Sequence, residues 1–499
     1  MSDAAILLDG GTLSIAGLEA AARGAQVAIA PGGLDRMRAS RAVIERAVSE
    51  KRAIYGVTTG LGARVSETLD GATLAAFSLQ TLRGRAQAVG QPETVAAVRA
   101  GMIVRLNTLL SGHSGASVAV ADHLLACLNA GLTPVTGRIG SIGPSDLVVN
   151  ATVGLALTGE GRMHGPDGVG DAAAVMRRHG IAPLQPGPRD GLALAGHCGP
   201  SAGGAALALA ATARLFRAGQ SAAALSLEGF RANLAPLDPR ALAAKPLPGQ
   251  AGAVQDLCRR LEGSRLWQAG QARRLQDPLS LRHIAQIHGA LWLAMEQAER
   301  IALIEINGAS DNPVVDPATG DVVPTGAYYS AELALVCETV TRATLGAAMA
   351  LVARIARLLD PRTGDLPPFL ARDAATSNGF APLMKTAEAL VAEIAHAAQP
   401  PAIWPSLNAL GVEDTMSTTP VAVRALERAV DHMALLVCLE FIVAAQAVDL
   451  RGCAPDLGPF LGRCHDRVRG ICPPLDDDRS LSAEIELLAG AIRDGTFDL

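Results

Sequence analysis

Tyrosine is scarce in this chain, so the positions of its three copies are informative. Tyr55 opens the glycine-rich stretch YGVTTGLG, and the other two, Tyr328 and Tyr329, are adjacent in the sequence. A phenol has an ordinary pKa of about 10 and needs nearby positive charge to act as a base near neutral pH. Lys385 and Arg85 are candidates for that charge, provided that folding brings them close to Tyr55. Without such a neighbour, Tyr55 would only cap a turn through its hydroxyl group.

The stretch from residue 140 to 147 reads GSIGPSDL. It resembles the GSVGASGDL segment of the histidine, phenylalanine and tyrosine ammonia-lyases, in which Ala-Ser-Gly cyclises into the electrophile methylidene-imidazolone (MIO). Cyclisation needs a cramped turn that glycine permits because it lacks a β-carbon. Here Pro144 and Ser145 replace the triplet after Gly143, and Asp146 stands where the cyclising glycine would be. We therefore expect the loop scaffold without MIO, with cyclisation of Ser145 left open as an alternative.

Two further motifs resemble substrate-binding segments of the same lyases. Residues 276–282 read QDPLSLR and resemble QDPYSLR, whose arginine grips the substrate carboxylate through a bidentate fork, so the resemblance gives that role to Arg282. Leu279 replaces the usual tyrosine, which removes one polar contact and leaves room for a bulkier head group. Residues 310–313 read SDNP, as in the lyases, where the asparagine binds near the substrate's carboxylate and amine. Asn312 is therefore a substrate-binding candidate, although an Asx turn before proline explains it equally well.

Residues 411–417 read GVEDTMS and resemble NQEDHVS of the histidine ammonia-lyases, in which the glutamate accepts a hydrogen bond from the imidazole ring. Phenylalanine-type enzymes tend to carry glutamine there, so Glu413 favours a substrate whose ring offers N–H donors. Lys385 follows the stretch SNGF at a position where the lyases carry an apolar residue. It would steady negative charge on the ring, lower the pKa of the tyrosine or pair with Glu413. For both residues the plain alternative is a solvated surface charge.

Other positions of the resemblance complete the predicted site. In the lyases the tyrosine of the YGVTTGLG-like stretch removes the β-proton of the substrate, which gives Tyr55 the role of base. Arg85 falls where histidine lyases carry the histidine of SHAAG, and Gly196-His197-Cys198 displaces an asparagine of the family. His197 either replaces that asparagine by a small shift in register or is a satisfied core histidine. Tyr328 and Tyr329 are expected to contact a quaternary ammonium through cation–π attraction.

The composition excludes several classes of protein and partner. The net charge of −5 provides no basic footprint for nucleic acid, and no cluster of residues has the spacing of a metal site. The eight cysteines are scattered without CxxC pairs, and four of them lie in apolar, helix-like sequence and are expected to be reduced core thiols: Cys127, Cys258, Cys337 and Cys438. This pattern indicates a cytoplasmic location. Neither a signal peptide nor a run of about 18 to 20 uninterrupted apolar residues is evident, so no membrane partner is expected.

Apolar residues recur with helical spacing over most of the chain, which predicts a mainly α fold. Hydrophobic residues make up 49% and charged residues only 18%, a balance typical of long helices that also pack against partner subunits. We expect an N-terminal mixed domain over residues 1–190, with the tyrosine loop and the MIO-like loop, and a long helical bundle over 191–499. Its helices are expected at 192–233, 251–272, 281–306, 331–359, 385–398 and 420–450. The resemblance implies an L-aspartase/fumarase-like fold and a homotetramer whose active sites combine loops of three subunits.

An enzyme that keeps the base, the carboxylate clamp and the ring acceptor but lacks the electrophile can still eliminate an amine that leaves unaided. Trimethylamine is such a group, because the nitrogen of a betaine is already cationic. Within the aromatic amino acid ammonia-lyase superfamily, the chain therefore most resembles the cofactor-free ergothionase branch, which splits ergothioneine into trimethylamine and thiourocanate. We expect a carbon–nitrogen lyase acting on a histidine-derived small molecule. Two alternatives stay open: a histidine ammonia-lyase-type enzyme with MIO, and a catalytically inactive lyase-like binding protein.

Overall fold

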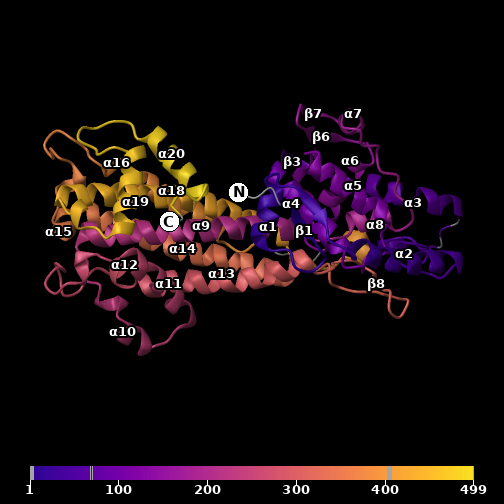
Figure 1. The fold of residues 1–499 in the computed structure, drawn as a ribbon, viewed down its shortest axis with the longest axis horizontal. Coiled ribbons are helices and arrows are strands. Elements are labelled where there is room, and N and C mark those ends of the chain that lie inside the picture. The colour runs from indigo at the N-terminus through magenta and orange to yellow at the C-terminus, as the bar shows by residue number, and fades with distance from the viewer. Residues whose placement is uncertain (1–4, 68, 70, 402–406, 498–499) are drawn as a thin grey trace. The chain divides into compact units, whose positions relative to one another are not determined.

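Helices make up most of the computed structural model, which describes residues 5–67, 69, 71–401 and 407–497 (Figure 1). The mainly α fold predicted from the sequence is confirmed. The chain packs into two compact units. Unit 1 comprises residues 1–210, 299–335 and 401–423, and unit 2 comprises residues 211–298, 336–400 and 424–499. Four long helices contribute residues to both units: α9 (Gly199–Phe230), α13 (Ile284–Asn307), α14 (Ala331–Leu359) and α18 (Thr419–Arg451).

Unit 1 combines short strands with helices of moderate length. Its helices are α1 (Ile15–Ala22), α2 (Gly33–Ser49), α3 (Gly71–Arg83), α4 (Val95–Leu109), α5 (Val118–Asn129), α6 (Leu147–Leu157), α7 (Ala172–Arg178), α8 (Asp190–Ala195) and α17 (Asn408–Gly411), with the 3-10 turn η1 (Gly62–Arg64). Helix α4 illustrates how these segments begin as helices and pack into the core of unit 1. The hydroxyl of Thr94 caps its start by accepting from the N–H of Ala97, and every residue from Val98 to Leu109 is buried.

The strands of unit 1 form four small sheets. Strands β1 (Ile6–Leu8) and β2 (Val27–Ile29) pair in parallel around α1. The other pairings are antiparallel: β3 (Val89–Pro92) with β5 (Gly137–Ile139), β4 (Thr133–Pro134) with β6 (Arg162–Gly165), β6 with β7 (Gly168–Asp171), and β8 (Val314–Asp316) with β9 (Asp321–Val323). The β8–β9 hairpin leads into the segment that carries Tyr328 and Tyr329.

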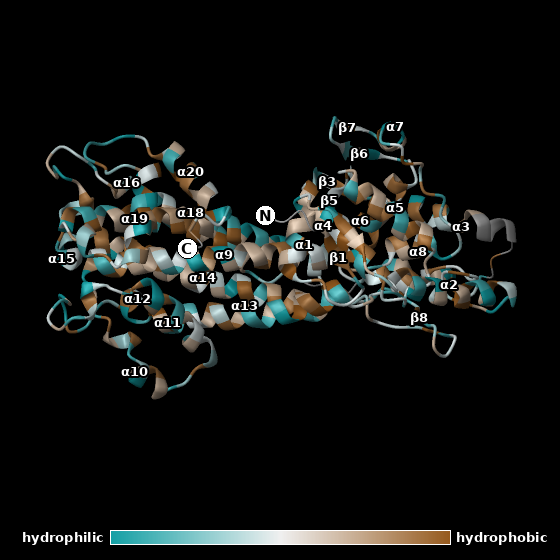
Figure 2. Cartoon of the chain, in the orientation of Figure 1, coloured by the Kyte–Doolittle hydropathy of each residue, from teal (hydrophilic) through white to brown (hydrophobic). Residues whose placement is uncertain are grey.

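The described residues of unit 2 form helices joined by turns and loops, without a strand. Besides its parts of the long helices it contains α10 (Pro239–Ala243), α11 (Pro248–Arg260), α12 (Leu279–Arg282), α15 (Pro361–Gly364), α16 (Ala381–Ala397), α19 (Pro459–Ile471) and α20 (Ser482–Arg493), with the 3-10 turns η2 (Ala235–Leu237), η3 (Arg265–Trp267), η4 (Pro368–Leu370) and η5 (Ala454–Asp456). Hydrophobic positions, drawn in brown, recur along the long helices (Figure 2). Their burial supplies the main stabilising term of the unit.

Helix α18 is the more apolar of two long apolar helices, α14 and α18, and forms part of the core. By length and composition, both α14 and α18 are long and apolar enough to cross a membrane, but 83% of the most apolar window of α18 is buried inside the protein. Its Glu440 is fully buried and forms a bidentate ion pair with Arg354, with Nε–Oε1 and Nη2–Oε2 distances of 2.6 and 2.9 Å. The hydroxyl of Ser226 also donates to Glu440 at 2.8 Å. A charge that is paired and hydrogen-bonded in this way is typical of a protein core.

The predicted helices differ from the observed ones in their ends and in two breaks. The helix expected at 281–306 is α12 and α13, and the one expected at 385–398 is α16, Ala381–Ala397. The helix expected at 331–359 is confirmed, whereas the one expected at 192–233 is two helices, α8 and α9, separated at Gly196–Cys198. The helix expected at 251–272 is α11, which ends at Arg260. The apolar residues beyond it belong to the separate 3-10 turn η3. The division into domains at residue 190 stays a prediction, and residues 1–4, 68, 70, 402–406 and 498–499 of those domains lie outside the described residues.

Candidate functional site

A cavity of about 370 Å³ in unit 1 brings together most of the residues singled out from the sequence. Those that line it are Tyr55, Arg85, Pro144, Ser145, Asn312, Tyr328, Tyr329 and Glu413. They come from five separate stretches: the turn after α2, the end of α3, the loop before α6, the β8–β9 region and the segment between α17 and α18. Polar groups converging on one cavity from several loops are typical of a small-molecule site.

The phenol oxygen of Tyr55 accepts a hydrogen bond from the backbone N–H of Gly62 at 3.0 Å. Gly62 begins the 3-10 turn η1, so the hydroxyl lies at the end of a turn where N–H groups are otherwise unpaired. A donor aimed at this oxygen stabilises negative charge on it. The role of Tyr55 as base stays a prediction.

Arg85 lies within electrostatic range of Tyr55. It is one of the two cations that the sequence suggested as neighbours of this tyrosine. Burial lowers the pKa of the Arg85 guanidinium from its ordinary value. The charge of Tyr55 opposes that change, the charge of Arg64 adds to it, and Glu413 also opposes it. Burial likewise raises the pKa of Tyr328, and the negative charges of Tyr55 and Glu413 raise it further. Arg85 and Tyr328 thus each lie within electrostatic range of both Tyr55 and Glu413 at the cavity.

The loop at 143–145 presses against the segment that precedes α18. Gly143 has φ +119°, and a β-carbon there would lie 2.1 Å from Oγ of Ser417 and 2.9 Å from the backbone nitrogen of Thr418, so only glycine fits. Ser145 has φ +52°, and its N–H donates to the carbonyl of Tyr328 at 2.7 Å. The loop is thereby fixed to the wall that carries the paired tyrosines.

Asp146 is buried behind the loop and does not line the cavity. Its carboxylate accepts from the backbone N–H and the hydroxyl of Ser201, at 2.7 and 2.8 Å, in the first turn of α9. Its own N–H donates to the carbonyl of His197 at 2.9 Å. Closure of an MIO ring would need that nitrogen to attack the carbonyl carbon of Pro144 instead. The contacts of Asp146 therefore do not fit the ring.

His197 is a buried support of the loop rather than a cavity-lining residue. Its Nδ1 accepts from the N–H of Gly199 at 3.1 Å, and its carbonyl accepts from the side-chain amide of Asn150 at 2.6 Å. Burial and the nearby charge of Arg105 hold its pKa well below the ordinary value, so the ring is neutral. This placement favours a core histidine with satisfied hydrogen bonds over a substrate-binding replacement for the family's asparagine.

Asn312 is held at the cavity by a buried ionic cluster beneath it. Arg105 forms a bidentate pair with Asp311, with both N–O distances at 2.9 Å, and Arg189 donates to Asp311 at 3.3 Å. Burial alone would raise the pKa of Asp311, but the two guanidinium groups hold it below its ordinary value. Arg189 also donates to the carbonyl of Asn312 at 3.2 Å. The amide oxygen of Asn312 accepts from Thr325, so its NH₂ group is the donor that a ligand carboxylate would meet.

Two predicted site residues belong to unit 2 and do not line this cavity within one chain. Arg282, at the end of α12, donates to the side-chain amide of Gln276 and lines a separate cavity of about 330 Å³ together with Asp277 and His283. Lys385 is exposed on α16. Their predicted roles in substrate binding and catalysis stay predictions.

Several cavity-lining residues were missed in the sequence. Arg64 follows YGVTTGLG after one residue, and Asp414 and Thr415 follow Glu413, so proximity to a motif was a usable signal for these three. Apolar lining residues such as Leu192 and Val412 carried no chemical signal. Among the described residues, no group of three or more His, Cys, Asp or Glu side chains is placed to hold a metal ion.

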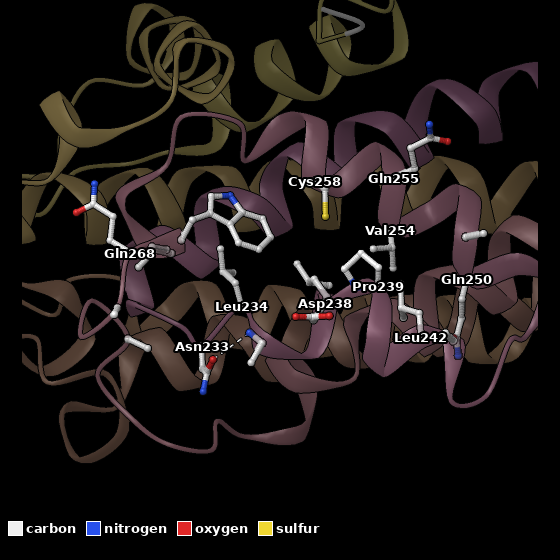
Figure 3. A pocket seen from close by; sticks show the side chains of 18 of the residues that line it. Asn233, Leu234, Asp238, Pro239, Leu242, Gln250, Val254, Gln255, Cys258 and Gln268 are labelled. Atoms are coloured by element: carbon white, nitrogen blue, oxygen red, sulfur yellow. Dashed lines mark hydrogen bonds between the residues drawn. The ribbon is translucent and has the colours of Figure 1, made fainter.

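A larger cavity of about 1280 Å³ lies in unit 2, between the segment around α10 and helix α11 (Figure 3). Apolar side chains such as Leu234, Val254 and Trp267 dominate its lining. Asp238 also lines it, but its carboxylate is paired with Arg240. It contains none of the residues predicted for catalysis, so size alone does not make it the active site.

The chain is similar over nearly its whole length to known enzymes. A family model described as aromatic amino acid lyase matches residues 13–470. The histidine ammonia-lyase of Anaeromyxobacter sp. (strain K) is 33% identical over 508 aligned residues that cover 99% of each chain. Among solved structures, ergothionase from Treponema denticola in complex with desmethyl-ergothioneine sulfonic acid matches with a TM-score of 0.93 and 26% identity over 99% of each chain. Histidine ammonia-lyase from Trypanosoma cruzi matches with a TM-score of 0.91 and 27% identity, covering 98% of this chain and 94% of that one.

Proposed function

Since this chain belongs to the aromatic amino acid lyase family and is a carbon–nitrogen lyase, we propose that it eliminates trimethylamine from ergothioneine, giving thiourocanate, without an MIO group. One observation carries the proposal: the cavity retains Tyr55 and Glu413, while Asp146 replaces the cyclising glycine and is tied to Ser201 and His197. The base and the ring acceptor are therefore kept where the electrophile is lost. The likeness to an ergothionase structure supports the same reading.

The proposed reaction is a β-elimination carried out by side chains alone. Tyr55, as phenolate, takes a proton from the β-carbon, and the electron pair of that C–H bond forms the Cα–Cβ double bond. The Cα–N bond breaks, and trimethylamine leaves with its electron pair. No electrophile is needed because the leaving nitrogen is quaternary and cationic before the reaction begins. Arg85 and the N–H of Gly62 stabilise the phenolate.

The other cavity residues would bind and orient the substrate. Glu413 accepts a hydrogen bond from a ring N–H, and the NH₂ group of Asn312 donates to the carboxylate. The rings of Tyr328 and Tyr329 face the quaternary ammonium, a cation–π contact worth about 0.5 to 2 kcal/mol.

Arg282 and Lys385 enter the proposal as residues supplied by partner subunits. We propose a homotetramer in which Arg282 clamps the carboxylate and Lys385 acts on the ring side of the substrate, because the cavity lining of one chain contains neither. All eight cysteines are free thiols, which supports placing the enzyme in the reducing cytoplasm.

A histidine ammonia-lyase-type enzyme with MIO is the second candidate, favoured by the 33% identity to histidine ammonia-lyases. One assay separates the two: the purified protein is incubated with ergothioneine, hercynine or histidine, and the released amine is identified. Trimethylamine together with a conjugated acrylate product from ergothioneine is the expected result. Ammonia from histidine, with a chain mass lower by two waters, would establish the second candidate. Ligand-dependent stabilisation without turnover of any of the three would indicate an inactive binding protein.

A further inference from the structure

An exposed hydrogen bond between two hydroxyl groups joins two segments that line the cavity. The hydroxyl of Tyr329 lies 3.1 Å from Oγ1 of Thr415, although the two residues are 86 positions apart in the sequence. Both residues line the cavity. Tyr329 follows the β8–β9 hairpin, whereas Thr415 lies two residues after Glu413 in the segment between α17 and α18.

Two backbone carbonyls anchor the C-terminal end of the segment that carries Glu413. There the N–H of Thr418 donates to the carbonyl of Ile142 at 3.1 Å, and the hydroxyl of Thr419 donates to the carbonyl of Ser330 at 3.0 Å. Towards its N-terminal end, Ala409 and Leu410 both have left-handed backbones, with φ +50° and +57°, which are strained for residues with a β-carbon. The side chain of Leu410 is 92% exposed.

Glu413 lies between the anchored end and the strained end. The N–H of Glu413 donates to the carbonyl of Asn408 at 3.2 Å, which is a contact within the same segment. The hydroxyl of Thr415, two residues after Glu413, therefore links this segment to the one that carries Tyr329. A segment with a strained, exposed end needs such a link to hold a carboxylate at a constant position.

From this geometry we propose that Thr415 and Tyr329 form a positioning pair that holds Glu413 at a set distance from the tyrosine ring. The inference rests on the proposed function, in which Glu413 binds the substrate ring and Tyr329 faces the cationic head group. The pair would then select substrates by the separation of their ring and their charged nitrogen. Neither hydroxyl takes part in bond breaking, so the pair acts mainly on binding.

The test is a double-mutant cycle with Thr415→Val, Tyr329→Phe and both together, measured with ergothioneine as substrate. Each single change removes one hydroxyl and should lower kcat/KM by roughly 2- to 10-fold, mostly through a higher KM, because a neutral hydrogen bond contributes modestly. The double variant should be no worse than the worse single variant, because both remove the same bond. Thr415→Ser keeps the hydroxyl and should restore near-normal KM.

A matched control is Thr319→Val, since Oγ1 of Thr319 donates to Asp316 at the same 3.1 Å distance but does not line the cavity. That variant should have wild-type kinetics. An unchanged KM in Thr415→Val, or effects that multiply in the double variant, would overturn the positioning pair.

Hydrogen–deuterium exchange of the ligand-free protein separates this inference from the proposed function. Peptides covering residues 407–418 should exchange faster in Thr415→Val and Tyr329→Phe, but not in Thr415→Ser. Faster exchange without turnover of ergothioneine would uphold the pair and reject the substrate. If Thr415→Val and Tyr329→Phe exchange at the wild-type rate and still turn over ergothioneine, the positioning pair is rejected and the substrate is upheld.

Discussion

In the proposed reaction Tyr55 is the base, and its phenol oxygen accepts a hydrogen bond from the N–H of Gly62. We expect Tyr55→Phe to lower kcat by at least about 100-fold, because removal of a general base typically costs that much. The dissociation constant for ergothioneine should change little, since the ring is retained. Steady-state kinetics and calorimetric titration measure the two quantities.

Tyr328→Phe is the matched control for this prediction, because it removes a hydroxyl from the same cavity while leaving the base in place. It should keep most of the turnover. Retention of full activity by Tyr55→Phe would mean that another group takes the β-proton.

Glu305 makes the stability of unit 1 depend on pH. Burial raises its pKa to about 7, partly opposed by the hydroxyl of Ser330, which donates to Oε2 at 2.9 Å; the charges of Asp146 and Glu332 add to the rise. A folded-state pKa above the unfolded value means that the folded protein binds the proton more tightly. The stabilisation is therefore complete below about pH 4.5 and is lost as the pH rises through 7, by about 3 kcal/mol in all.

We expect the wild-type protein to lose thermal stability between pH 5 and 8, and Glu305→Gln to flatten that fall. The comparison variant is Glu388→Gln on α16, where the side chain is exposed and the profile should match the wild type. Parallel wild-type and Glu305→Gln curves of melting temperature against pH would contradict the assignment.

Cavity-lining side chains could be predicted from the sequence where they belong to a recognisable motif. Tyr55, Asn312 and Glu413 were predicted in this way, and all three line the cavity. Thr415 was not singled out because a threonine has no distinctive chemistry until a partner 86 residues away is seen to meet it. Such a pairing depends on tertiary structure and leaves no local pattern.

The loop before α6 provides a prediction that separates the two candidate reactions. If no MIO forms, Ser145→Ala should retain most of the wild-type turnover, because the serine oxygen is not lost in a cyclisation. Intact-mass spectrometry of the wild type should give the unmodified chain mass. Loss of activity in Ser145→Ala together with a mass deficit of two waters would show that the loop cyclises.

The turn that carries Asn312 depends on Asp311 as a buried counter-ion. We expect Asp311→Asn to destabilise the protein by about 3 to 5 kcal/mol, because it leaves Arg105 and Arg189 buried without their carboxylate. Urea unfolding measures the change. Asp316→Asn, in the exposed β8–β9 turn, is the control and should cost far less. Similar midpoints for both variants would rule out a structural role for the cluster.

At the element scale, the long helices could be predicted because their apolar residues recur over many turns. The break between α8 and α9 was missed because Gly196-His197-Cys198 sits inside an otherwise apolar run. The break exists because the His197 carbonyl accepts from Asp146 and Asn150, contacts that no local pattern reveals. The three-residue strands are too short to produce a recognisable alternation.

At the scale of the whole molecule, the location of Arg282 and Lys385 outside the lining of the unit 1 cavity leads to a prediction about assembly. Light scattering should give four times the chain mass of 51.1 kDa. Tyr55→Phe and Arg282→Ala should each be nearly inactive alone, yet co-expressed chains should regain part of the activity. Some sites would then combine an intact Tyr55 from one subunit with an intact Arg282 from another. Absence of any recovery would place both residues of each site on the same chain.

The scarcity of tyrosine makes the protein its own optical reporter. Tyr55, Tyr328 and Tyr329 are all the tyrosines of the chain, and all three line the same cavity. An ultraviolet difference signal from phenol or phenolate on adding a ligand would therefore arise in this cavity and nowhere else in the chain. Isotope labelling of tyrosine alone would likewise produce three resonances, each from a wall of the site, so that occupancy and ionisation could be followed without attaching a probe.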